Sequence, residues 1–135
     1  MKTLFAGLLM TATTLAAHAD EIKRVPLPNS NFPISLAVSV PPQTELLFVS
    51  GLLADLHDAK APKDSFAAYG DTAIQTTSIL NKLKGVLQSQ GLDLGDVVQL
   101  RVFLVGDPAK GGKLDFAGLQ EGYTPFFGSA EQPKK

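Results

Sequence analysis

The chain has 135 residues, no cysteine and a formal net charge of −1, and 44% of its residues are hydrophobic. This length fits a single domain. The lack of cysteine excludes disulfides, thiolate catalysis and zinc sites built on cysteine. Because the charge is nearly balanced, the protein offers no general field for a polyanion, and we expect no nucleic-acid partner.

The first nineteen residues are typical of a cleavable signal peptide. Lys2 provides a short positive region, residues 4–16 form an apolar stretch, and Ala17-His18-Ala19 fits the small-x-small cleavage rule. A retained membrane anchor is the alternative, but the apolar run is shorter than the ~20 residues that a span needs. We therefore expect a signal peptide over residues 1–19, a domain over residues 20–135, a periplasmic or secreted location, and no membrane contact after cleavage.

Only one histidine, His57, lies in residues 20–135. A site with several histidine ligands is therefore excluded within one chain, and a Ser-His-Asp triad would have to use this loop residue. A solvated side chain is the common role of such a histidine. We expect no metal and no cofactor, which leaves carboxylates, hydroxyls and backbone groups for chemistry.

The first half of the domain predicts strands. Residues 23–28 can form at most an edge strand, because their prolines cannot donate to a ladder. Residues 34–40 and 45–51, joined by a short proline-rich turn, predict a hairpin, and the apolar second strand is expected to be central in its sheet. Ser50 and Gly51 end that strand where a ligand can approach the backbone; a plain strand end and turn is the other interpretation.

A long amphipathic helix follows a polar connection over residues 52–70. Compact and apolar positions recur there at three and four residues, at Ala73, Thr76, Ile79, Leu80, Leu83, Val86 and Leu87. Asp71 favours the helix start, and Gly91 supplies a left-handed residue at its end.

Residues 97–105 predict a strand with two unlike faces. Val98, Leu100, Val102 and Leu104 are uniformly apolar and should meet the helix, whereas Gln99, Arg101, Phe103 and Val105 form a mixed face. The mixed face is expected to line a cleft or a subunit interface. Arg101 either points into that cleft or is a solvated arginine of a sheet.

Residues 114–128 predict a second helix, in which Gly118, Gly122 and Pro125 weaken the pattern. Its aromatic and apolar residues at helical spacing are expected in the core; they are Phe116, Leu119, Tyr123, Phe126 and Phe127. The order of elements is an α+β plan, with two helices packed on one face of a mixed β-sheet.

Several runs of this plan resemble the RidA/YjgF family of small enamine and imine deaminases. They are Pro33 with Ser35-Leu36-Ala37-Val38, Leu47-Phe48-Val49-Ser50-Gly51, Asp71 with Gln75-Thr76, Leu80-Asn81, Gly91-Leu92, Asp96-Val97-Val98, Val102-Phe103-Leu104, and Asp115-Phe116 with Tyr123 and Phe126-Phe127. The resemblance runs from about Pro33 to Phe127 and rests on the order and spacing of all the runs together.

The resemblance implies a chorismate-mutase-like fold and a homotrimer with ligand clefts between subunits. It also implies the hydrolysis of reactive enamines, such as 2-aminoacrylate, to the keto acid and ammonia without a cofactor. The ligand, an enamine, imine or carboxylate, would contact Ser50, Gly51, Phe103, Gln120 and Tyr123. Arg101 would join them if it points into the cleft, in place of the family's arginine. The family's carboxylate-binding arginine and water-placing glutamate lie on two further strands, which are expected beyond Lys135, so the catalytic residues are unknown.

Three positions depart from the family pattern: Ile34 replaces an aromatic residue, Leu52 a glutamine and Gln120 an asparagine. A noncatalytic member that binds a small molecule or a partner is therefore the alternative to a deaminase. The family's older description as a messenger-RNA ribonuclease finds no support, because the chain has no basic patch.

Overall fold

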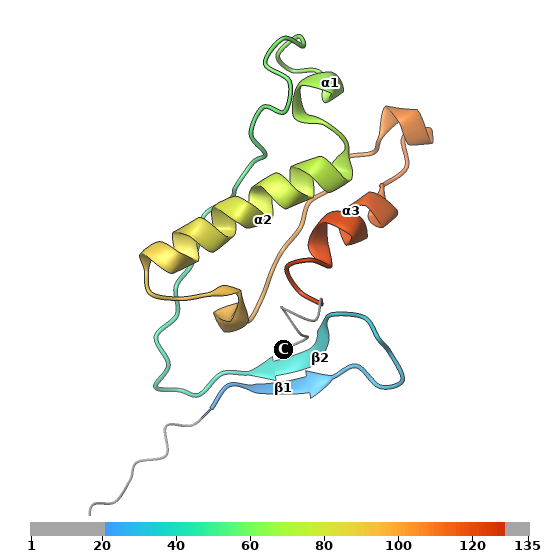
Figure 1. Cartoon of the computed structure of the whole chain (residues 1–135). Helices are drawn as coiled ribbons and strands as arrows, with labels where there is room; N and C mark the ends of the chain where they lie inside the picture. Colours follow the sequence, from blue (N-terminus) through green and yellow to red (C-terminus); the bar gives the residue numbers. More distant parts are fainter. Residues whose placement is uncertain (1–20, 129–135) are drawn as a thin grey trace, which may run out of the picture.

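The computed structural model describes residues 21–128, so the signal peptide expected over residues 1–19 lies outside the described residues. The described chain is an α+β structure with a two-stranded antiparallel sheet and three α-helices (Figure 1). Its helices are α1 (Phe66–Tyr69), α2 (Thr72–Ser89) and α3 (Phe116–Tyr123). None of the described helices is both long and apolar enough to cross a bilayer.

Helix α2 forms as the sequence predicts. The Asp71 side chain accepts a hydrogen bond from the Ile74 backbone N–H (2.9 Å), which caps the first turn. At the other end Gly91 has φ of 73°, and the backbone N–H of Leu92 donates to the Leu87 carbonyl oxygen (2.9 Å). Together with the bond from Gly91 N–H to the Gln88 carbonyl, this is a Schellman motif.

The predicted apolar stripe of α2 is the centre of the core. Leu80, Leu83 and Leu87 are buried together with Leu94, which lies in a short 3₁₀ helix (Leu94–Asp96) after α2. Helix α3 packs beside α2, as the two-helix plan requires. The partly buried side chains around this core come from distant segments; they are Val49, Leu52, Leu92, Val97, Tyr123, Phe126 and Phe127.

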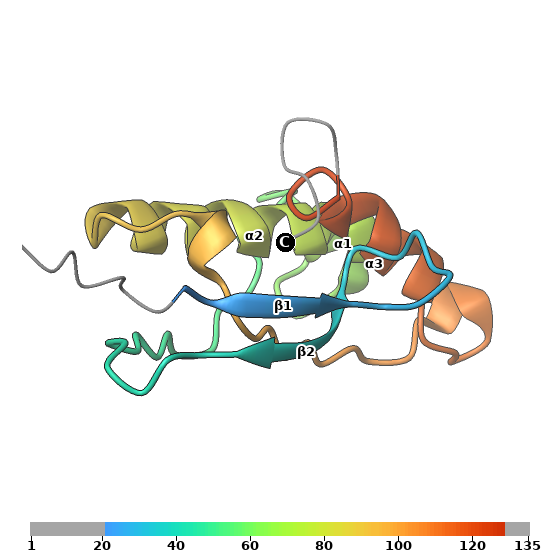
Figure 2. The same cartoon turned by 90° about the horizontal axis from the view of Figure 1, so that it is seen from below.

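The sheet differs from the prediction. Strand β2 (Ser35–Ser39) does not pair with residues 45–51 as the expected hairpin requires, but with β1 (Lys23–Pro26), with Val25 opposite Ala37 (Figure 2). A bulge follows at Pro26, the residue that cannot donate a ladder hydrogen bond. The segment 23–28, expected at most as an edge strand, is therefore one half of the sheet in the described residues.

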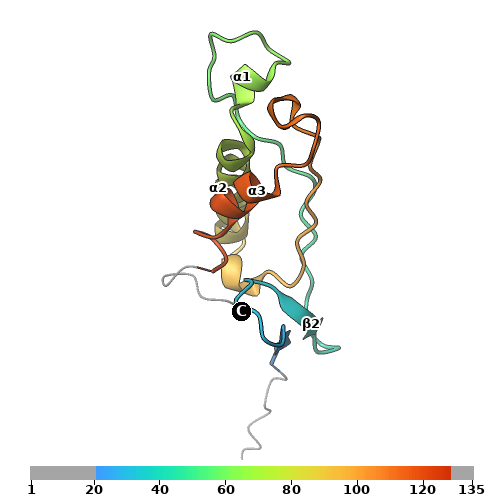
Figure 3. The same cartoon turned by 90° about the vertical axis from the view of Figure 1, so that its right-hand side faces the viewer.

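Residues 45–53 and 97–105 are extended but join no ladder within the described chain, so the expected mixed sheet is absent there. Both segments cross the same side of α2 and α3 (Figure 3). A strand requires a hydrogen-bonding neighbour as well as a suitable sequence. The apolar pattern correctly predicts that these segments are extended. It does not predict which segments lie beside them.

One predicted core residue is wrong. Phe116 is 54% exposed and stacks on Phe32, with the ring centroids 6.2 Å apart. Helix α3 turns Gly118 and Gly122, both buried, toward α2, and Phe116 lies on the other side of that helix. These two glycines, which weaken the helical pattern in the sequence, form the face of α3 that contacts α2.

Candidate functional site

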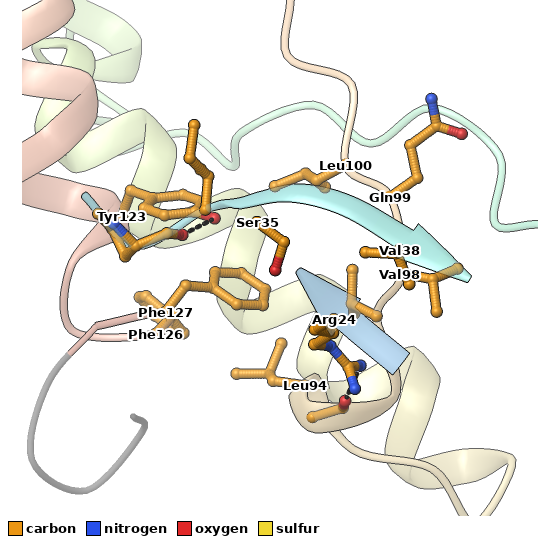
Figure 4. A pocket seen from close by; sticks show the side chains of 14 residues that line it. Arg24, Ser35, Val38, Leu94, Val98, Gln99, Leu100, Tyr123, Phe126 and Phe127 are labelled. Atoms are coloured by element: carbon orange, nitrogen blue, oxygen red, sulfur yellow. Dashed lines mark hydrogen bonds between the residues drawn. The ribbon is translucent and has the colours of Figure 1, made fainter. Parts of the chain in front are cut away.

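A pocket of about 270 Å³ lies between the β1–β2 hairpin, the 3₁₀ helix after α2 and the end of α3 (Figure 4). Apolar and aromatic side chains provide most of its wall, and a few polar groups converge on it, as is usual for small-molecule sites. Its lining residues are Arg24, Pro33, Ile34, Ser35, Val38, Leu94, Gly95, Val97, Val98, Gln99, Leu100, Tyr123, Phe126 and Phe127.

Arg24 is the charged residue of this pocket. It comes from β1 and is half-buried, and one of its terminal guanidinium nitrogens donates to the Gly95 carbonyl oxygen (2.8 Å). No carboxylate of residues 21–128 forms an ion pair with it. Arg24 also borders a neighbouring hollow of about 390 Å³ on the hairpin. The guanidinium therefore has N–H groups available for an acceptor from outside the chain.

The aromatic wall is built at the end of α3. The Tyr123 ring stacks on Phe127 with centroids 4.9 Å apart, and its hydroxyl group lies 3.4 Å from the Pro33 carbonyl oxygen, to which it donates. Burial raises the pKa of Tyr123 above its ordinary value, so the hydroxyl is neutral and a donor at physiological pH.

The residues predicted from the sequence to bind a ligand are not gathered in this pocket. Only Tyr123 lines it, while Gln120 lies half-buried on α3. Ser50 and Gly51 are exposed on one extended segment, and Arg101 and Phe103 are exposed on the other. The predicted site lies between subunits. The structure of a single protomer does not test it, so it stays a prediction.

Arg24 was missed by the sequence analysis. The signal that could have found it is alternation: Ile22, Arg24 and Pro26 share one face of a strand, so the arginine stands among apolar neighbours. A cation in such a position is either paired or directed at a ligand.

The buried carboxylate of the described chain, Asp115, has a structural role. Its side chain accepts hydrogen bonds from the Lys110 ammonium group (2.8 Å) and from the Gly118 backbone N–H (3.0 Å), which caps α3. The hydrogen bond from Lys110 is the main reason why the pKa of Asp115 is lowered, and that from Gly118 adds to it. Asp115 is therefore a charged helix cap and is already fully engaged.

His57 lies in the connection before α1, where its backbone N–H donates to the Ala68 carbonyl oxygen (2.7 Å). Residues 21–128 contain no group of three histidine, aspartate or glutamate side chains that could hold a metal ion.

Comparison with known proteins shows what this α+β chain is similar to. No protein-family model matches it. A curated relative nevertheless supports the resemblance found in the sequence: it is a RutC family protein, and RutC belongs to the RidA/YjgF superfamily.

That relative is a RutC family protein of Pyrococcus horikoshii. It is 31% identical to this chain over 70 residues, which is 52% of this chain and 51% of the relative. The chain thus spans about half the length of the curated relative it matches.

Proposed function

We propose that the protein is an enamine/imine deaminase-like hydrolase that works as a homotrimer in the periplasm or outside the cell. Its substrates would be reactive enamines such as 2-aminoacrylate. One observation carries the proposal beyond the RutC similarity: the segments with the predicted site residues present large apolar side chains to the outside. Phe48 is 88% exposed and Phe103 is 84% exposed. Exposed apolar surface of this kind is typical of an interface between chains.

The proposed fold of the assembly is chorismate-mutase-like. In that fold, residues 45–51 and 97–105 would be strands of a mixed sheet covered by α2 and α3. Two observations support this: both segments are extended, and both cross the same side of the helix pair (Figure 3). In the second segment Val98 and Leu104 are partly buried, whereas Leu100 and Val102, expected on the same helix-facing side, are exposed, as are Phe103 and Val105.

The proposed reaction needs no cofactor. The enamine tautomerises to the imine, water adds to the imine carbon, and the tetrahedral product loses ammonia to leave the keto acid. In the cleft, Arg101 would bind the substrate carboxylate in a bidentate contact. The Ser50 hydroxyl and the Gly51 backbone N–H would orient the substrate and the attacking water.

A coupled assay tests the deaminase. Purified protein is mixed with enzymatically generated 2-aminoacrylate, and ammonia release is followed against the spontaneous rate. The protein should accelerate release, and Arg101→Gln should lower kcat/KM by about tenfold or more, because it removes a hydrogen-bonded charge contact. Lys84→Gln, an exposed charge change on α2, is the matched control and should leave the rate unchanged. Release at the spontaneous rate with the wild-type protein would reject the deaminase.

A noncatalytic binding protein is the second candidate, and one observation favours it. Leu52, which stands where the family usually has glutamine, packs against the buried leucine core. It cannot supply the amide of that glutamine to a cleft. In the same assay this candidate gives no acceleration, although small carboxylates still bind.

The proposed export is tested on the protein itself. Cells that express the chain are fractionated, and the mass of the recovered protein is measured. Cleavage after Ala19 gives a protein that begins at Asp20 in the periplasm or medium. Full-length protein retained in the cytoplasm would reject the signal peptide.

A further inference from the structure

The pocket at Arg24 is separate from the proposed cleft between subunits. Its wall comes from β1, β2, the 3₁₀ helix after α2, residues 97–100 and the end of α3, all within one protomer. Of the residues predicted to bind the enamine, Tyr123 lines this pocket, whereas Ser50, Arg101 and Phe103 do not. A ligand in this pocket therefore meets Arg24 and not Arg101, the cation of the proposed deaminase cleft.

The charge of the pocket selects an anion. The Arg24 guanidinium has five N–H donors. Within the described residues it makes one hydrogen bond, to the Gly95 carbonyl oxygen. That bond fixes the guanidinium plane against the 3₁₀ helix, at the pocket wall (Figure 4). A planar carboxylate can pair with the remaining N–H groups in a two-point contact, for which arginine is suited.

The rest of the wall selects an apolar body. Phe127 and Tyr123 provide stacked rings on one side, and Leu94, Val97 and Val98 provide aliphatic groups near the arginine. A volume of about 270 Å³ lies just below the usual range of roughly 300–1,000 Å³ for small-molecule sites. The occupant is therefore small, with space for one ring or one branched chain.

We propose that this pocket binds a small monocarboxylate with an aromatic or branched apolar body, its carboxylate on Arg24 and its body against Tyr123 and Phe127. A phosphate or a polyanion fits less well, because Arg24 is the one cation among the lining residues. The Tyr123 hydroxyl already donates to the Pro33 carbonyl oxygen, so Arg24 supplies the donors for the carboxylate. This site goes beyond the proposed function and does not depend on it.

The test uses 3-phenylpropanoate as the probe, with 3-phenylpropan-1-ol as its uncharged analogue and acetate as its truncated analogue. Binding to purified protein is measured by isothermal titration calorimetry. The acid should bind at least about tenfold more tightly than the alcohol, as expected for a charge-assisted hydrogen-bonded contact, and acetate should bind more weakly than the acid. Equal binding of acid and alcohol would overturn the proposal.

Arg24 and Arg101 are the two arginines of this chain, so their glutamine variants form a matched pair that compares the two proposed sites. Arg24→Gln should abolish the preference for the acid, Arg24→Lys should keep part of it, and Arg101→Gln should leave it intact. Loss of binding in Arg101→Gln alone would place the carboxylate in the proposed subunit cleft. That outcome supports the deaminase and overturns the present site.

Amide chemical shifts can be measured on the wild-type protein, so this test does not depend on a variant that could misfold. On titration with 3-phenylpropanoate, the shifts should concentrate at Arg24, Gly95 and Val98, and at Phe127. Shifts confined to Ser50, Gly51 and Phe103 would overturn the proposal. Val98→Phe, which adds a ring at the wall, should block the probe while circular dichroism remains that of the wild-type protein.

Discussion

Gly122 of α3 lies directly against Thr76 of α2. A Cβ atom at Gly122 would stand 2.7 Å from the Thr76 Cβ atom and 2.7 Å from the Ala73 carbonyl oxygen. The Thr76 hydroxyl is itself turned back onto its own helix, where it donates to the Thr72 carbonyl oxygen (2.7 Å). The backbone of Gly122 is therefore in direct contact with α2. The helices can pack this closely only because Gly122 has no side chain.

Gly122→Ala should lower the free energy of unfolding by about 1–3 kcal/mol, because the added methyl group meets backbone that cannot yield. Gly85→Ala is the control on α2. A Cβ atom there meets nothing within 4 Å, so the change should stabilise the protein by about 0.5–1 kcal/mol through helix propensity. Urea unfolding followed by circular dichroism measures both. A stabilising Gly122→Ala would show that the helices are less closely packed.

Gly91→Ala tests the end of α2 without any packing change. Gly91 has φ of 73° and open space around it, so the cost comes from the backbone conformation alone. We expect a loss of about 1–2 kcal/mol for alanine in this left-handed conformation. Asparagine tolerates the conformation better, so Gly91→Asn should cost less. Equal costs for the two variants in thermal or urea unfolding would contradict the Schellman assignment.

The ion pair between Lys110 and Asp115 predicts an acid-sensitive contribution to stability. The pKa of Asp115 is lowered in the folded protein, chiefly by its hydrogen bond with Lys110. Its contribution is therefore complete above the unfolded pKa of about 3.9 and is lost as the pH falls through the lower folded pKa. The pKa of Lys110 is raised, again chiefly by Asp115, so its contribution is lost as the pH rises through that raised value.

Unfolding midpoints of the wild-type protein and Asp115→Asn should thus differ by a constant amount from about pH 5 to pH 9, and the difference should shrink below about pH 4. Glu121→Gln, an exposed charge change on the same helix, is the control and should show no such convergence. A difference that grows toward low pH would contradict the sign of the Asp115 shift.

The sequence was sufficient for α2 because every signal of that helix is local. Asp71 caps the residue three positions ahead, Gly91 closes the last turn, and the buried leucines recur at helical spacing. The extended character of residues 45–53 and 97–105 was equally visible. The pairing of these segments could not be predicted, because the neighbour of a strand depends on the rest of the fold. In the structure β2 pairs with β1 instead.

The site was less predictable than the helix. Tyr123 was found through its place in an aromatic pattern, but Arg24 was passed over because the prolines around it favoured an edge strand. Its role depends on the Gly95 carbonyl, 71 positions away in the sequence. The remaining predicted residues, including Ser50 and Phe103, belong to the proposed cleft between subunits. No pattern within one chain contains that information.

Phe103→Asp tests that neighbouring copy. Phe103 is 84% exposed on the described protomer, and burial of such a side chain between subunits contributes about 1.5–3 kcal/mol for each copy. We expect wild-type protein to sediment as a trimer in analytical ultracentrifugation and Phe103→Asp to shift it toward monomer. Phe66→Asp is the control, because Phe66 is 51% exposed and begins α1, at the far end of the molecule from the hairpin (Figure 1). Its trimer should persist.

Because the proposed deaminase cleft would need two subunits while the proposed Arg24 site needs one, monomeric Phe103→Asp should lose ammonia release and still bind 3-phenylpropanoate. A wild-type monomer that releases ammonia would contradict the shared cleft.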